Sequence, residues 1–276
     1  MEARTIRLYI ANLGKYNEGE HVGGWLRLPI NDEGLTNFFT ERVQIGVPDA
    51  FGVPYEEWAI HDFEYGCDSI LEAVGYKPGE CDSIEALNDL ARIWHDVVGD
   101  DEGIAEKVGL YTGEMVIHEP DEITNIILQH EEIMDFLYNF DGIESCRNMD
   151  AEEKYGHSVA YQEGLTAVLE GFGSQAVSAF DFEKYGYDDW RYGQIALGYS
   201  FYIDYSDGPD PALYTREEIR ERAAEAQLGI EAYREPLGSR VMRAKEVSKT
   251  TGALSRDQNE RGTDGQIPVP DHARLK

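Results

Sequence analysis

The chain has 276 residues, of which 42% are hydrophobic and 11% aromatic, enough apolar material for packed cores and too much for a disordered acidic chain. Its 54 Asp and Glu outnumber 24 Lys and Arg, and the net charge of -30 argues against a positive track for direct nucleic-acid binding. No apolar run approaches the ~18 residues of a membrane helix and the N-terminus opens on polar residues, so we expect no membrane segment, no signal peptide and a cytoplasmic location.

The first part of the chain predicts a small α+β domain, residues 1–64. Alternation of apolar and more polar residues predicts strands over 5–10, 24–29 and 57–64. A short helical pattern at 35–39 lies between the second and third of these strands. We therefore expect a small sheet accompanied by a short helix.

A mainly helical second domain is predicted over residues 65–144. Asp82 and Glu85 resemble a capping box, and apolar residues recur at helical spacing from there to Val98. This pattern predicts a helix that buries one face. The acidic, glycine-bounded segment 99–103 interrupts it.

Two further elements are predicted in the second domain. Residues 114–118 fit a short strand, and apolar residues at helical spacing predict a helix from Asp121 to Tyr138. Acidic residues in the first turn of that helix suit the positive end of its dipole.

The third predicted domain, residues 145–208, combines helix and strand. A moderate helical pattern covers 159–169, and strict alternation over 195–205 is the clearest strand pattern in the chain. Between them, acidic and aromatic residues interleave over 180–190. Pro209 then marks a boundary.

Residues 209–276 form a charge-neutral extension. Thr215 and Glu218 predict a capping box that opens a charged helix reaching about Arg234. Beyond Pro236 the chain is polar and almost free of aromatic residues, which predicts flexibility. The predicted fold class is thus α+β, in three small domains followed by a helical and flexible C-terminal extension.

The negative charge is confined to the first three domains. Residues 1–208 hold 42 Asp and Glu against 12 Lys and Arg, whereas residues 209–276 hold 12 of each. Salt adaptation predicts uniform acidity, while confined acidity favours a working surface. Duplex DNA carries about one charge per ~1.7 Å of axis, so the excess corresponds to roughly 50 Å of duplex. The charge pattern therefore favours imitation of a polyanion.

The patterns of metal, cofactor and catalytic sites are weak. The cysteines Cys67, Cys81 and Cys146 fit neither a disulfide framework nor a metal motif, and the seven histidines are scattered. Residues 171–176 fit G-x-G-x-x-A but follow a predicted helix, and 204–210 fails as a calcium loop. We expect no cofactor, no metal and no enzymatic activity, although an enzyme with an acidic cleft stays an alternative.

Two early segments closely resemble the ArdA family of antirestriction proteins. They are Leu8-Tyr9-Ile10-Ala11-Asn12-Leu13-Gly14-Lys15-Tyr16-Asn17-Glu18-Gly19-Glu20 and Val22-Gly23-Gly24-Trp25-Leu26-Arg27-Leu28-Pro29. Residues 59–64 and 83–90 continue the resemblance, and 180–186 do so more loosely. The segment 98–106 is a loose counterpart of the family's antirestriction motif, and the resemblance ends near residue 207.

The resemblance implies an elongated array of three small domains with an acidic surface. Such proteins are homodimeric mimics of bent B-form DNA that mobile elements encode. They occupy the DNA-binding groove of type I restriction-modification enzymes, so the implied partner is the methyltransferase core of such an enzyme. A mimic directed at another DNA-binding protein has the same charge pattern and stays a second alternative.

We expect fifteen acidic side chains to bear the mimicking charge collectively. They are Glu18, Glu20, Asp62, Glu64, Asp68, Asp100, Asp101, Glu102, Glu131, Glu132, Asp135, Asp181, Glu183, Asp188 and Asp189.

Overall fold

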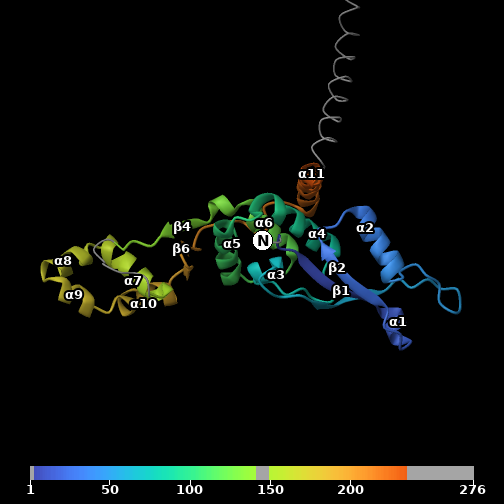
Figure 1. The fold of residues 1–276 in the computed structure, drawn as a ribbon, viewed down its shortest axis with the longest axis horizontal. Coiled ribbons are helices and arrows are strands. Elements are labelled where there is room, and N and C mark those ends of the chain that lie inside the picture. The colour runs from blue at the N-terminus through green and yellow to red at the C-terminus, as the bar shows by residue number, and fades with distance from the viewer. Residues whose placement is uncertain (1–2, 141–148, 235–276) are drawn as a thin grey trace, which may run out of the picture. The chain divides into compact units, whose positions relative to one another are not determined.

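Helices and two small antiparallel sheets make up residues 3–140 and 149–234, the part of the chain that the computed structural model describes (Figure 1). This content confirms the predicted α+β class. By its internal contacts the chain divides after Gly229, and the described residues beyond that point are the end of the last helix. The three domain borders drawn from the sequence stay a prediction.

The first sheet has the strand order β2-β1-β3 and is antiparallel throughout. Its strands are β1 (Ile6–Asn12), β2 (Gly23–Leu28) and β3 (Trp58–Phe63). All three predicted strands are confirmed. Alternation sets their two faces, because Ile6, Leu8 and Ile10 are fully buried while Arg7 between them is exposed.

Short helices flank this sheet and lie in the connections between its strands. They are α1 (Leu13–Asn17), α2 (Asp32–Asn37), the π-helical turn η1 (Phe38–Arg42) and, after β3, α3 (Ile70–Ala73). The short helix predicted at 35–39 is confirmed as part of α2 and η1. Buried Asn12 caps α1 and also donates from Nδ2 to the Val43 carbonyl at 2.9 Å, which ties β1 to the end of η1.

The central helices follow. They are α4 (Ile84–Ile93) with its π-helical continuation η2 (Trp94–Val98), α5 (Glu102–Glu114) and α6 (Pro120–Leu128). The predicted helix from 82 to 98 is confirmed, but its cap lies one residue later than expected. Ser83 accepts from the Ala86 amide, whereas the Asp82 carboxylate accepts from the Tyr76 hydroxyl at 2.6 Å.

Two predictions in this region are wrong. Residues 115–118 form no strand, since α5 continues to Glu114 and irregular chain follows. The helix predicted over 121–138 ends at Leu128, and the 3₁₀ turn η3 (His130–Glu132) and strand β4 (Met134–Leu137) take its place. Pairing of β4 with a distant strand outweighs the helical spacing of its apolar residues.

Four helices and a hairpin form the next segment. The helices are α7 (Ala151–Gln162), α8 (Leu165–Gly171), α9 (Ser174–Ala179) and α10 (Phe182–Tyr192), and the hairpin strands are β5 (Ile195–Leu197) and β6 (Phe201–Asp204). The second sheet has the order β4-β6-β5. The start of the third predicted domain, near Cys146, lies outside the described residues.

The sequence predictions for this segment need two corrections. The helical pattern at 159–169 is split between α7 and α8, because Gly164 adopts a left-handed conformation with φ +77°. The single strand predicted over 195–205 is a hairpin, in which the Gly198 amide donates to the Phe201 carbonyl at 2.9 Å and Tyr199 is exposed at the turn.

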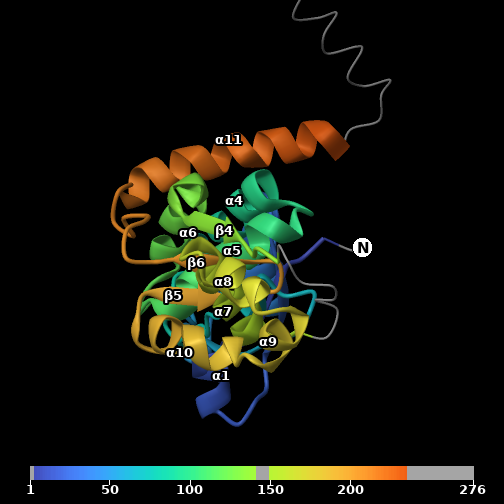
Figure 2. The same cartoon turned by 90° about the vertical axis from the view of Figure 1, so that its left-hand side faces the viewer.

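The helix predicted after Pro209 is confirmed as α11 (Arg216–Arg234). The Thr215 amide donates to the Glu218 carboxylate at 2.8 Å and the Glu218 amide donates back to the Thr215 hydroxyl at 3.4 Å, the reciprocal bonding of a capping box. Ile219, Ala223 and Ala226 are buried, and the last two belong to the same apolar core as β1 and α4. The first part of α11 therefore packs on the fold, and Figure 2 shows it beside α4. The flexibility predicted beyond Pro236 concerns residues outside the described part.

Candidate interaction surface

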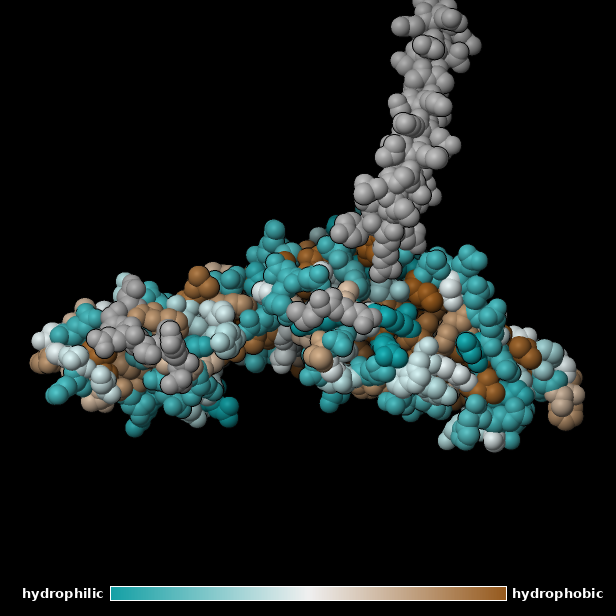
Figure 3. Space-filling model, in the orientation of Figure 1, coloured by the Kyte–Doolittle hydropathy of each residue, from teal (hydrophilic) through white to brown (hydrophobic). Residues whose placement is uncertain are grey.

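All fifteen carboxylates expected to bear the mimicking charge are exposed. Most of them lie in turns, at helix starts or at strand ends, where the chain runs over the surface and side chains reach solvent. Hydrophilic residues cover much of the face shown in Figure 3. The structure also brings together several of these acids that are far apart in the sequence.

One acidic cluster forms where the loop after β3 meets the start of α5. Asp68, Asp100, Asp101 and Glu102 line a hollow of about 130 Å³ together with Arg4. The left-handed Gly99, with φ +55°, ends η2 and turns the chain into this cluster.

The residues of this cluster differ in their partners. Asp101 caps α5 by accepting from the amides of Gly103 at 2.9 Å and Ile104 at 3.1 Å. Arg4 pairs with Glu102 at 2.8 Å. Asp68 and Asp100 form no ion pair with any described residue, so the cluster stays net negative.

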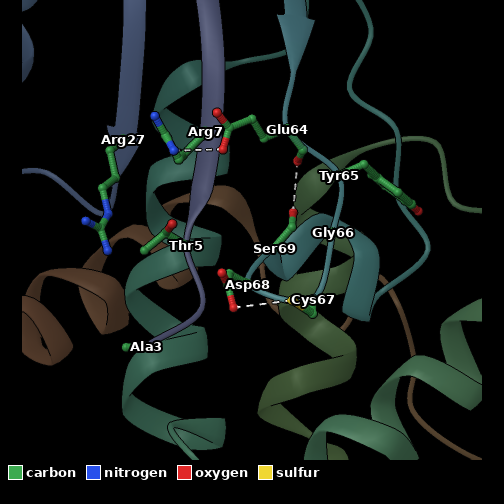
Figure 4. Close-up of a pocket in the computed structure, with 10 residues that line it drawn as sticks. All are labelled: Ala3, Thr5, Arg7, Arg27, Glu64, Tyr65, Gly66, Cys67, Asp68 and Ser69. Atoms are coloured by element: carbon green, nitrogen blue, oxygen red, sulfur yellow. Dashed lines mark hydrogen bonds and ion pairs between the residues drawn. The ribbon is translucent and has the colours of Figure 1, made fainter. Parts of the chain in front are cut away.

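A second hollow, of about 220 Å³, adjoins the first through Asp68 and Cys67 (Figure 4). Arg7 on β1 pairs with Glu64 at 2.8 Å on one side of it, and both side chains are about half exposed. The Cys67 thiol lies 3.6 Å from an oxygen of Asp68. Two arginines, Arg7 and Arg27, and two acids, Glu64 and Asp68, line this hollow, so it is less negative than the first.

Glu18 and Glu20 follow α1 and share one cation. Lys15 Nζ lies 3.6 Å from Glu18 and 3.3 Å from Glu20, and the Tyr55 hydroxyl donates to Glu18 at 2.7 Å. Hydrogen bonding with Tyr55 raises the pKa of Lys15, with further contributions from Glu20. Lys15 thus stays charged and fixes the two carboxylates in place.

The remaining acids surround the second sheet and α10. Glu131 and Glu132 lie in η3, and Asp135 on β4 pairs with Lys107 at 3.2 Å. Asp181 caps α10, since it accepts from the Lys184 amide at 3.0 Å.

Carboxylates of α7 and α10 lie near one another at the start of α7. The pKa of Glu153 is raised first by burial and then by the nearby carboxylates of Asp150, Glu183 and Asp181. Acids from α7 and α10 therefore form one concentrated negative region in space.

Five of the fifteen acids form ion pairs, namely Glu18, Glu20, Glu64, Glu102 and Asp135. Within residues 3–140 and 149–234, the other ten have no cationic partner within ion-pair distance. Most of the expected charge is thus available to a partner.

Sequence reasoning missed an aromatic pair on the outer face of the first sheet. Tyr9 and Trp25 face each other across β1 and β2, with ring centroids 5.6 Å apart in an edge-to-face arrangement. The alternation of the sequence does indicate this pair, because both residues occupy outward positions in strands whose inward positions are apolar.

Metal and nucleotide sites find no support in the described residues. No group of three or more His, Cys, Asp or Glu side chains there is arranged to hold a metal ion. The G-x-G-x-x-A segment lies between α8 and α9 and follows no strand. Cys67 and Cys81 are free and exposed, while Cys146 lies outside the described residues.

The fold and its exposed carboxylates define an acidic α+β protein equipped for binding. The model of the antirestriction protein ArdA family matches residues 8–206, and the chain belongs to this family. It is thus an antirestriction protein of a non-enzymatic family, and membership implies interaction with restriction enzymes. No curated protein matches the chain. None of the described helices is long and apolar enough to cross a bilayer.

Proposed function

We propose that this antirestriction protein imitates B-form DNA and competes with DNA for the DNA-binding groove of type I restriction-modification enzymes. The observation that supports the proposal best is the set of fifteen exposed carboxylates, of which five form ion pairs with cations in the described part of the chain. They lie within or next to the segment that matches the family, and the charge excess ends at residue 208, close to the end of that match at 206.

The physical basis of the proposed inhibition is that carboxylates of the protein replace DNA phosphates in the groove of the enzyme. Type I enzymes bind DNA, and DNA-binding grooves are lined by Lys and Arg that neutralise phosphates. Carboxylates offered in the same groove satisfy those cations and steer the encounter over long distances. Because the carboxylates belong to a protein that is not a substrate, the bound enzyme is blocked rather than turned over.

The assembly belongs to the same proposal. We assign the acidic charge to three domains, residues 1–64, 65–144 and 145–208, followed by the neutral extension 209–276. A homodimer doubles the length of DNA that the charge imitates. The setting is the cytoplasm of a cell that receives a mobile element, where incoming DNA meets restriction enzymes.

A competition assay tests the proposal. The purified full chain is titrated into a complex of a type I methyltransferase core with fluorescent duplex DNA, at low and at physiological salt. We expect displacement of the DNA at low salt, and an inhibition constant, corrected for the weaker binding of DNA, that rises with salt because screening weakens the protein's own binding. Absence of displacement at low salt rejects the proposal.

A further inference from the structure

The outer face of the first sheet carries a patch that differs from the rest of the acidic surface. Its side chains form two rows across β2, β1 and β3. One row is Trp25, Tyr9 and Asp62, which are register partners across the three strands. The other row is Arg27, Arg7 and Glu64, which Figure 4 shows side by side. We call these six residues the aromatic face.

The aromatic face is open to solvent. Trp25 is 44% exposed even though Tyr9 packs against it, and Asp62 and Glu64 are exposed beside them. The Asp62 carboxylate accepts from its neighbouring Phe63 amide at 2.9 Å and forms no ion pair with any described residue. An indole, a phenol ring and an unpaired carboxylate thus adjoin one another on one surface.

The aromatic face is also rigid. Its strands bury Leu8, Leu26 and Ile60 on their opposite side, so the backbone that carries the outward residues is fixed by the core. Edge-to-face packing restricts both rings further. A partner that binds here therefore immobilises few additional side chains, which favours affinity.

We propose that the aromatic face is the anchor for an arginine side chain of the partner protein, whose guanidinium stacks on the Trp25 ring, contacts Tyr9 beside it and pairs with Asp62. The identity of that partner as a restriction enzyme rests on the proposed function above. Arginine fits best because its planar cation stacks on aromatic rings and binds a carboxylate at the same time.

The anchor adds what the distributed carboxylates lack. Exposed charges accelerate association and tolerate shifts in alignment, whereas a stacked aromatic contact is short-ranged and fixes one alignment. Trp and Tyr are also the residues that most often dominate the energy of protein interfaces. The competing explanation is that Tyr9 and Trp25 merely stabilise the sheet as a cross-strand pair.

A peptide probe tests the anchor without any restriction enzyme. An alternating arginine-glycine peptide is titrated into the full chain while the indole N–H signals of its four tryptophans are followed by NMR. We expect the Trp25 signal, assigned by its loss in Trp25→Phe, to shift more than that of Trp190. The matched lysine peptide shifts it less, and a citrulline peptide leaves it unchanged, since citrulline carries no charge.

Two outcomes of the peptide experiment overturn the anchor. Equal shifts at Trp25 and Trp190 indicate attraction of the peptide to the acidic surface in general. A larger response of Trp25 to a single-stranded oligodeoxythymidine than to the arginine peptide indicates a base-stacking platform instead.

The competition assay supplies the second arm. We expect Trp25→Ala to weaken displacement of DNA roughly tenfold, through faster dissociation and with an unchanged salt dependence. Trp25→Phe keeps an aromatic ring and retains most of the activity. Phe172→Ala removes an 81% exposed aromatic side chain between α8 and α9 and serves as the matched control, with little effect expected.

The two proposals fail in different ways. If the unaltered chain displaces DNA and Trp25→Ala does so equally well, the anchor is rejected and DNA mimicry stands. If the unaltered chain displaces no DNA, mimicry of the type I substrate is rejected and the peptide titration decides the anchor. A large fall in the melting temperature of Trp25→Ala, with activity per folded molecule unchanged, supports the purely structural explanation.

Discussion

His157 is a titratable side chain that the fold keeps away from water. Its ring is only 4% exposed and stacks on Phe182 with centroids 3.6 Å apart. Burial lowers the pKa of His157 to about 4, so the folded protein holds it neutral at physiological pH. The contact joins α7 to α10, and protonation therefore acts on the packing of these two helices.

This burial predicts a pH-dependent stability. The folded pKa of about 4 lies below the ordinary value near 6.5, so the unfolded chain takes up the proton first as pH falls. Titration of His157 therefore leaves the free energy of unfolding unchanged above pH ~6.5 and lowers it between pH ~6.5 and ~4, by up to about 3 kcal/mol. Denaturant unfolding of the unaltered chain and of His157→Phe at several pH values measures the difference.

Comparison of the two chains isolates the histidine. Carboxylates away from residue 157 change the stability of both proteins alike, and Glu153, which lies 4.0 Å from His157 Nε2, is replaced by Gln in both chains so that the difference in unfolding free energy reports on His157. We expect this difference to shift in favour of His157→Phe between pH 6.5 and 4. Parallel curves over that range contradict the prediction.

Among the elements, α7 and α10 approach each other through glycines. A Cβ atom placed on Gly156 would lie 1.8 Å from the Phe182 carbonyl oxygen, and one on Gly186 would lie 2.9 Å from the Gly156 Cα. The two helices thus pack backbone against backbone. Any side chain at these positions forces them apart.

We expect Gly156→Ala to destabilise the protein by more than about 2 kcal/mol, because the obstructing atom belongs to the backbone and cannot rotate away. Gly171→Ala is the control, since nothing lies within 4 Å of its added Cβ and alanine favours helix. Thermal unfolding followed by circular dichroism compares them. Equal melting temperatures of the two variants would show that α7 and α10 tolerate separation.

The start of α11 is held by a buried ionic contact. Arg216 bonds Asp89 on α4 at 2.7 Å and Asp121 on α6 at 3.2 Å, and the Asp89 side chain is only 5% exposed. Burial raises the pKa of Asp89, while Arg216 and Arg92 oppose that effect. Asp89 therefore depends on its cations to remain ionised inside the fold.

Arg216→Met is expected to destabilise the protein by about 1 to 3 kcal/mol, since among the described residues it leaves the buried Asp89 carboxylate with a single ion-pair partner, Arg92. The expected loss of stability is modest because the Arg216 side chain is itself 37% exposed. Arg220→Met, on the same helix and exposed, is the comparison: Arg220 lowers the pKa of Asp89 by attraction alone and forms no ion pair with it among the described residues, so a smaller loss is expected. Adding Asp89→Asn to Arg216→Met restores part of the loss, and urea unfolding measures all four proteins. A loss in Arg220→Met equal to that in Arg216→Met contradicts the role of this contact.

Elements fixed by local signals could be predicted from the sequence. The three strands of the first sheet follow from alternation, and α11 follows from the capping box at Thr215 and its apolar stripe. Elements that depend on distant partners could not. Met134–Leu137 becomes β4 only because β6 pairs with it, and the turn at Gly198 splits a continuous alternation into a hairpin.

The candidate surface divides in the same way. That the fifteen acids are exposed follows from their charge, whereas their role in binding stays a prediction. Their neighbours do not follow from the sequence. The meeting of Asp68 with Asp100, and the row formed by Trp25, Tyr9 and Asp62, require the sheet register and the path of the loops.

For the whole molecule, the proposed function rests on charge that acts collectively. We therefore expect Asp100→Asn alone to change displacement of DNA less than about twofold. Joint amide substitution of eight acids that neither cap a helix nor belong to the aromatic face should weaken displacement strongly and reduce its salt dependence. The eight are Glu20, Asp68, Asp100, Glu131, Glu132, Glu183, Asp188 and Asp189.

Substitution of three exposed acids on α11 is the control for the position of the charge in this experiment. Glu217, Glu221 and Glu225 lie beyond the family match and outside the region of excess charge. Their joint change to Gln should leave displacement of DNA nearly unaltered. Loss of inhibition from Asp100→Asn alone would argue for a few irreplaceable residues and against distributed mimicry.

The contact between Arg216 and the two carboxylates has a consequence for chimeras of family members. The family match ends at residue 206, yet buried residues of α11 complete a core that begins with β1. A chimera that exchanges residues 1–208 alone would separate Asp89 from Arg216, one of the two arginines that pair with it. Two parents recombine at that border without loss of stability only if both carry an acid at position 89 and an arginine at position 216. The segment that has to be exchanged as one piece therefore extends at least to Ala226.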